Sequence, residues 1–119
     1  MPSTGLNGPY KLNEDTIEKT VTKKSAGAYA LGHTKKKEKV TTFIVEYVGR
    51  ADEDINDRLK KWIGKEYTHF KFKYHDSSKA AFEKECNLYH DWKNLDNKLH
   101  PDRSKDKDWQ CPRCDAFKK

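Results

Sequence analysis

One acidic residue of this chain lies within an apolar stripe. Residues 79 to about 93 show helical periodicity, and Glu85 shares the apolar face with Ala81 at i−4 and Leu88 at i+3. Burying a carboxylate is costly unless a cation or a metal ion compensates its charge. The pattern alone favours a buried salt bridge, with Arg58 as the candidate partner, over a metal site.

Arg58 and two tyrosines are further candidates for chemistry. Arg58 borders the apolar face of an expected helix, where its stem could simply cover apolar neighbours while the guanidinium stays in water. Tyr29 and Tyr47 lie on neighbouring expected strands, and packing in the core is the simpler interpretation of both rings. Taken singly, none of the three indicates a reaction.

Cysteine and histidine spacing predicts a structural Zn²⁺ site. Cys111-Pro-Arg-Cys114 has the two-residue spacing of a zinc knuckle, which is half of a site. Cys86 and His90 are one helical turn apart, so their side chains meet on one face. Together they form a Cys₃His set, while His100 is a competing fourth ligand that would give a Cys₂His₂ set with His90. A redox-active CxxC pair and unliganded thiols remain the other interpretations.

The elements that must position these residues begin with two strands. Gly27–Gly32 is the first, and the second is Thr41–Val48, which is rich in β-branched and aromatic residues. The basic stretch His33–Lys39 between them is expected to be an exposed hairpin loop, which implies antiparallel pairing.

A helix, a third strand and a second helix follow. Asp52 is the expected N-cap of the first helix and Gly64 its C-cap. Tyr67–Tyr74 alternates aromatic with basic residues, as a strand with one packed and one basic face does. Ser77 or Ser78 caps the second helix. The order β-β-α-β-α predicts an α+β fold in which helices flank a small three-stranded antiparallel sheet.

The two ends of the chain are expected to lie outside this domain. Residues 1–24 are interpreted as a partly ordered lead-in, with a possible short helix capped at Asn13. Residues 25–93 form the domain. Residues 94–119 form a polar tail that packs on the last helix, with zinc as the staple that keeps it folded.

The net charge of the chain indicates which classes of partner it can attract. The 119 residues contain 25 Lys and Arg against 19 Asp and Glu, for a net charge of +6. Such a chain attracts polyanions, nucleic acid first among them, although a charged surface also serves simple hydration. No apolar run approaches the roughly 20 residues of a membrane helix, and no signal-peptide pattern opens the chain. A cytoplasmic protein is expected.

Taken in order, the candidate residues resemble the GIY-YIG nuclease domain. Gly27-Ala28-Tyr29 corresponds to GIY and Tyr47-Val48-Gly49 to YIG, while Arg58 and Glu85 lie on the two helices that follow. The segments YVGRADEDINDRLKKW and KAAFEKECNLYH are similar to the family's core and its glutamate helix. The resemblance covers about residues 27–90. The two isoleucines are replaced, and the segment between the second motif and the arginine is slightly longer than usual.

This resemblance implies a metal-dependent endonuclease that hydrolyses phosphodiester bonds in DNA. Glu85 would hold Mg²⁺ or Mn²⁺, which stabilises the leaving oxygen. Arg58 would bind the non-bridging oxygens, where charge grows. Tyr29 or Tyr47 would help to activate the attacking water, although a tyrosine is a poor base unless cationic neighbours lower its pKa.

Further residues would contact the nucleic acid. Arg50, directly after the second motif, would contact a phosphate, and His33 and His69 are additional candidates for the base. If the hairpin tip and the third strand share one side, their lysines form a track for a phosphate backbone. These lysines are Lys35, Lys36, Lys37, Lys39, Lys71 and Lys73.

Two other function classes remain as alternatives. One is a non-catalytic nucleic-acid-binding module on the same fold, since a fold does not guarantee chemistry. The other is a zinc-containing protein-interaction domain with an incidental basic surface. The combination of two tyrosines, an arginine and a glutamate favours the enzyme, because a binding module needs no carboxylate facing phosphate.

Overall fold

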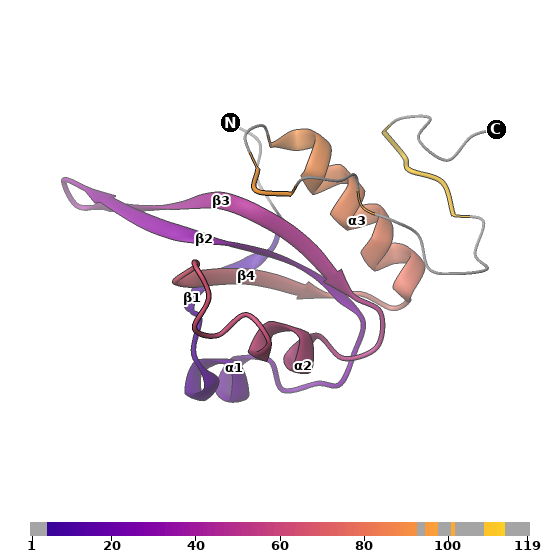
Figure 1. Cartoon of the computed structure of the whole chain (residues 1–119), viewed down its shortest axis with the longest axis horizontal. Coiled ribbons are helices and arrows are strands. Elements are labelled where there is room, and N and C mark those ends of the chain that lie inside the picture. Colours follow the sequence, from indigo (N-terminus) through magenta and orange to yellow (C-terminus); the bar gives the residue numbers. More distant parts are fainter. Residues whose placement is uncertain (1–4, 93–94, 98–100, 102–108, 114–119) are drawn as a thin grey trace.

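The chain forms one sheet with helices on both of its sides (Figure 1). The computed structural model describes residues 5–92, 95–97, 101 and 109–113. Within them the elements are β1 (Asn7–Lys11), α1 (Glu14–Thr20), β2 (Gly27–Lys37), β3 (Val40–Ala51), α2 (Ile55–Lys60), β4 (His69–Tyr74) and α3 (Ser78–Asp91). The predicted α+β class is confirmed. In Figure 1, α1 and α2 lie below the sheet and α3 lies above it. None of these helices has the length and apolarity that crossing a membrane requires.

The sheet has four antiparallel strands in the order β1-β4-β2-β3, so the prediction of three strands is wrong. The additional strand, β1, pairs with β4 through Asn7 opposite Phe72 and Tyr10 opposite Phe70. Its sequence contains Gly8 and Pro9, which usually interrupt strands, but a strand at the sheet edge tolerates proline. Packing of the Tyr10 ring on Phe70, with 5.6 Å between centroids, fixes β1 against the core.

The antiparallel pairing of β2 and β3 is confirmed, but the loop expected at residues 33–39 is wrong for most of its length. The ladder continues to Lys37 opposite Val40, and only Glu38 and Lys39 form the turn. Glu38 has a φ of 56°, the backbone conformation that such tight hairpin turns require. A run of lysines thus forms strand, because the ladder satisfies its backbone groups without burial of the side chains.

Local capping explains where the helices begin. Asn13 and Ser77 cap α1 and α3 as predicted, each accepting a hydrogen bond from the backbone three residues on. The cap of α2 is Asp54 and not Asp52, because β3 continues through Ala51 and delays the helix. Gly64, with a φ of 81°, ends the turns that follow α2.

The two faces of the sheet carry separate cores. Tyr29 and Leu31 of β2 pack with Phe70 and Phe72 of β4 and with residues of α1 and α2. Ala30, between them in sequence, belongs to a second cluster that includes Leu88 of α3. The predicted alternation of β4 is confirmed. It places Lys71 and Lys73 opposite Ala30 and Ala28, on the α3 side of the sheet.

A register shift divides the β2–β3 ribbon into two parts. Tyr47 pairs with Leu31 and Val45 with Gly32, so Glu46 is an extra residue of β3 at this point. A Cβ at Gly32 would lie 1.8 Å from the Ile44 carbonyl oxygen, so this close approach of the two backbones requires glycine.

Candidate active site

Close packing of neighbouring atoms requires glycine at two positions of the GAY and YVG motifs. Gly49 lies opposite Tyr29 in the ladder, and a Cβ there would be 2.5 Å from the Tyr29 hydroxyl oxygen. A Cβ at Gly27 would lie 2.5 Å from the Lys73 carbonyl oxygen and 2.8 Å from Ile55 Cδ1. The motifs therefore let the Tyr29 ring lie across β3 and let β2 approach both β4 and α2.

Trp62 connects the two motif tyrosines. Its Nε1 donates a hydrogen bond of 2.9 Å to the Tyr29 hydroxyl, and its ring packs on Tyr47 with 4.7 Å between centroids. Tyr29 is 3% exposed, whereas Tyr47 is only half-buried. Tyr47 is thus the more exposed of the two tyrosines. Nothing in the spacing of Trp62 along the sequence predicted this hydrogen bond.

The electrostatics of the tyrosines link all four motif residues. Burial raises the pKa of Tyr29 above its ordinary value, although the Trp62 hydrogen bond opposes the shift. Burial and the charge of Glu85 raise the pKa of Tyr47, while the charge of Arg58 lowers it. Arg58 and Glu85 also act on Tyr29. Residues of β2, β3, α2 and α3 therefore share one electrostatic environment, in which both hydroxyls stay protonated at neutral pH.

Glu85 is buried and paired, as predicted, but its partner is Arg50 and not Arg58. The Glu85 side chain accepts a 2.8 Å hydrogen bond from Arg50 Nη1, and Arg50 Nε donates to Asp52 at 2.9 Å. The Arg50 guanidinium also lies over the rings of Phe82 and Trp109, at 5.1 Å and 5.8 Å from their centroids. Arg50 is thus engaged on several sides, in contrast to its expected contact with a phosphate.

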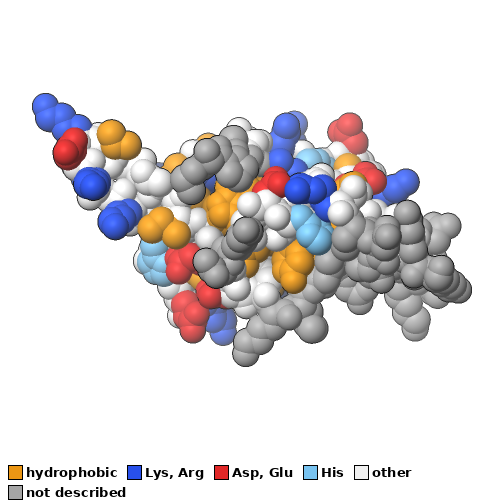
Figure 2. All heavy atoms as spheres, turned by 90° about the horizontal axis from the view of Figure 1, so that it is seen from above, with side chains coloured by type: hydrophobic (Ala, Val, Ile, Leu, Met, Phe, Trp, Pro, Cys, Tyr) orange, Lys and Arg blue, Asp and Glu red, His pale blue; other side chains and the backbone are white. Residues whose placement is uncertain are grey.

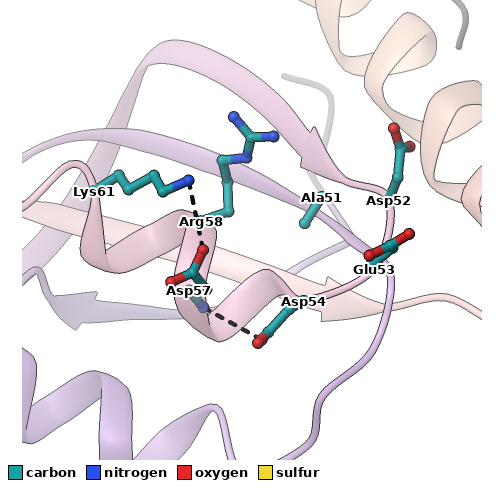
Figure 3. A pocket seen from close by; sticks show the side chains of 7 residues that line it. All are labelled: Ala51, Asp52, Glu53, Asp54, Asp57, Arg58 and Lys61. Atoms are coloured by element: carbon teal, nitrogen blue, oxygen red, sulfur yellow. Dashed lines mark hydrogen bonds and ion pairs between the residues drawn. The ribbon is translucent and has the colours of Figure 1, made fainter. Parts of the chain in front are cut away.

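Arg58 is the exposed cation of the group. It lines a cavity of about 320 Å³, and Figure 3 shows its guanidinium extending toward β3, away from Asp57 and Asp54. Asp57 pairs with Lys61 at 3.5 Å, whereas none of the described carboxylates forms an ion pair with Arg58. Its guanidinium is therefore available to bind an anion. The other residues that line the cavity are Ala51, Asp52 and Glu53.

The carboxylates fit a divalent cation only in part. Across the described residues, no three metal-ligating side chains come together. Glu85 and Asp52 nevertheless converge on one cation, the Arg50 guanidinium. Mg²⁺ is commonly bound through one or two carboxylates, with water and substrate phosphate as the remaining ligands. Within the described residues, Glu85 and Asp52 are thus paired with a protein cation, and further ligands to a metal ion would have to come from water or substrate.

A short segment of the tail covers the edge of β3. The Asn97 side chain accepts from Val48 N at 2.9 Å and donates to Val48 O at 2.8 Å, and Asp96 N donates to Glu46 O at 2.6 Å. Tyr67 donates its hydroxyl hydrogen to Asp96 at 2.6 Å. These bonds satisfy an exposed strand edge beside Tyr47. The polar tail sequence gave no periodic signal that could have predicted them.

The predicted nucleic-acid contacts divide between the two sides of the sheet. Lys35 and Lys37 follow Tyr29 and Leu31 at alternate positions of β2, so they lie on the α2 side. Lys36, Lys71 and Lys73 lie on the α3 side, and Lys39 is in the turn. One continuous track of all these lysines, which the prediction made conditional on a shared side, is therefore absent. Of the two spare histidines, His33 pairs with Glu46, and His69 hydrogen-bonds to Thr68 at 2.8 Å.

Two of the predicted zinc ligands, Cys86 and Cys111, are buried in one cluster. His90 lies in the last turn of α3, while His100 and Cys114 are outside the described residues.

Comparison of the chain with family models, curated proteins and solved structures gave no match.

Proposed function

We propose that the chain is a metal-dependent endonuclease that hydrolyses phosphodiester bonds in duplex DNA. The observation that supports this proposal is that the charges of Arg58 and Glu85 both act on Tyr29 and Tyr47, whose side chains Trp62 connects. Their hydroxyls, guanidinium and carboxylate are the groups that phosphodiester hydrolysis uses. The GIY-YIG family, which the motifs resemble in sequence, has these four residue types in the same order along the chain.

Arg58 binds the scissile phosphate in this proposal. Its exposed guanidinium has no ion pair among the described carboxylates and can donate two parallel hydrogen bonds to non-bridging oxygens. Negative charge on these oxygens grows in the transition state, so the interaction strengthens as the reaction proceeds. Lysine could not replace it fully, because an ammonium lacks the planar fork.

Tyr47 and Tyr29 have different roles. Tyr47 is the more exposed of the two and its raised pKa keeps the hydroxyl protonated, so it holds the attacking water by a hydrogen bond and does not act as the base. Tyr29 is a positioning residue, since it is buried and acts through the Trp62 indole that packs on Tyr47. Trp62 thereby keeps the Tyr47 ring at the edge of the sheet.

Glu85 would hold Mg²⁺ or Mn²⁺, with Asp52 as the nearest further carboxylate that shares the same guanidinium. When bound, the metal stabilises charge on the phosphoryl and leaving oxygens. Arg50 is a positioning residue here, because its guanidinium holds the buried Glu85 carboxylate by a 2.8 Å hydrogen bond.

The outer end of the β2–β3 ribbon supports duplex DNA as the substrate. Figure 2 shows it projecting from the body of the protein with lysine side chains at its end. On the side of Tyr29, Lys35 and Lys37 pair with Thr42 and Val40. Val40 is 63% exposed. A two-stranded ribbon fits the major groove of duplex DNA, where lysines reach the phosphates on either side.

The test is nicking of supercoiled plasmid in Mg²⁺ and in Mn²⁺. Glu85→Gln should reduce the rate by about 10²–10³-fold, the loss typical of removing one group that stabilises transition-state charge. Glu83→Gln, on the same helix, is the matched control and should cleave normally. Thermal unfolding of Glu85→Gln distinguishes lost chemistry from lost fold, because the variant removes one of the two carboxylates that pair with Arg50.

Other results would select another function. Equal cleavage by Glu85→Gln and the native chain would contradict the proposed site. Absence of cleavage by the native chain, with binding of duplex that weakens as salt increases, would favour the non-catalytic module. Absence of both would favour the protein-interaction domain.

A further inference from the structure

The tail folds back onto α3 at two buried cysteines. Cys86 of α3 is 0% exposed and Cys111 is 6% exposed, and their thiol groups are hydrogen-bonded to each other. Phe82 and Trp109 complete this small cluster. Residues distant in sequence therefore bring two sulfur atoms together in a pocket that excludes water.

The loop after Cys111 is held against the same helix. Arg113 N donates a hydrogen bond of 3.4 Å to Cys111 Sγ, so the backbone turns around the sulfur. Hydrogen bonds of this kind orient a thiolate ligand and stabilise its charge. The Arg113 side chain also pairs with Asp91 of α3 at 2.6 Å. The loop thus contacts α3 at Cys86 and again at Asp91, the residue that follows His90.

We propose that Cys86, Cys111, Cys114 and His90 bind a structural Zn²⁺ that fastens the tail to α3. Cys86 and His90 are one helical turn apart, and the two loop contacts lie beside them. Cys114 completes the CxxC spacing directly after Arg113 in the sequence. Three thiolates and an imidazole form a closed tetrahedral set, which is the ligand chemistry of structural zinc.

The ion would also support the candidate active site. Trp109 belongs to the cysteine cluster, and the Arg50 guanidinium lies over its ring. Arg50 in turn donates to Glu85. Binding of zinc would therefore fix the aromatic wall that holds Arg50 in place. The zinc site itself does not depend on the proposed function, because its ligands are separate from the motif residues.

Metal analysis of the full chain tests this inference without any activity measurement. Protein purified without a metal-affinity step should contain about one Zn²⁺ per chain. Replacement by Co²⁺ should give the absorption bands of thiolate-to-cobalt charge transfer. Cys86→Ser and Cys114→Ser should both lose the metal, whereas His75→Ala should retain it. Cys114→Ser keeps the test valid if the buried Cys86→Ser variant does not fold.

Two further variants examine the histidine. His90→Ala should lose zinc and His100→Ala should retain it, and the reverse result would overturn the assignment of His90. Metal-free purified protein whose thermal unfolding is unchanged by added Zn²⁺ would overturn the whole site, as would full zinc content in both cysteine variants. None of these results decides whether the chain cleaves DNA, because the zinc ligands are separate from the motif residues that the nicking experiment tests.

Discussion

The two ends of the β2–β3 ribbon differ in every respect except their backbone. At the inner end, Gly27–Leu31 pairs with Tyr47–Ala51 between helices of both sides. At the outer end, His33–Lys37 pairs with Val40–Ile44 in solvent. One hydrogen-bonded ladder runs through both, with its register shift at Gly32. The comparison teaches that the ladder alone maintains the strands, while burial determines where side chains are fixed.

The difference should appear most strongly at Gly49 of the inner end. Gly49→Ala places a methyl group against the Tyr29 ring, and such overpacking costs about 1–3 kcal/mol. The matched change at the outer end, Thr42→Ala, should alter the free energy of unfolding by less than about 0.5 kcal/mol. Urea denaturation of both variants measures this. Similar losses in the two variants would show that the outer end is packed as tightly as the inner end.

The lysines of the outer end should affect binding of duplex DNA and not the free energy of unfolding. Replacing Lys35 and Lys37 together by Ala should weaken duplex binding about tenfold at low salt and reduce the salt slope by about 2. Replacing Lys71 and Lys73, on the α3 side of the sheet, is the matched control and should change neither. Fluorescence anisotropy across a salt series measures both pairs. A larger effect from replacing Lys71 and Lys73 would indicate that DNA binds on the α3 side of the sheet.

Acidification should weaken the inner end slightly through His75, which follows β4 and hydrogen-bonds to the backbone of Ala26. Burial, followed by the charges of Lys73 and Lys84, lowers the pKa of His75 below its ordinary 6.5. The unfolded chain therefore binds more protons once the pH falls below 6.5. The contribution of His75 to the free energy of unfolding is complete above pH 6.5. It is lost as the pH falls through the lowered pKa that His75 has in the folded protein.

Urea denaturation between pH 7.5 and 5 checks this prediction. His75→Gln should reduce the loss of stability on acidification by less than about 1 kcal/mol, since solvent screens a half-exposed ring. His69, whose pKa burial also lowers, remains in the variant and retains its own share. An unchanged pH dependence in His75→Gln would show that His75 does not contribute.

Sequence patterns predicted those elements whose periodicity burial imposes. The α3 stripe and its Ser77 cap follow from apolar spacing, and so does the burial of Glu85 with a cationic partner. The outer ribbon was taken for a loop, because an exposed ladder leaves no apolar pattern. Similarly, β1 buries too little side chain to alternate clearly.

The partner of Glu85 could not be predicted for a different reason. Arg58 and Arg50 are both near the motifs in sequence, but the choice depends on which side of the sheet each one occupies. Arg50 reaches α3 from β3, whereas Arg58 extends from α2 on the opposite side. Periodicity within one element does not specify how two helices are distributed over a sheet. The order of the motif residues along the chain does not depend on that choice.

The extra residue at Glu46 gives the outer ribbon an unusual route to change. Glu46 has no partner in β2, whereas Tyr47 pairs with Leu31 and Val45 with Gly32. Deleting Glu46 would therefore leave the cross-strand pairs of the ribbon unchanged and would remove only the local bend and added twist of β3. A single-codon deletion could thus change the direction in which the outer ribbon projects in one evolutionary step, while leaving its side-chain pairs and its charge in place.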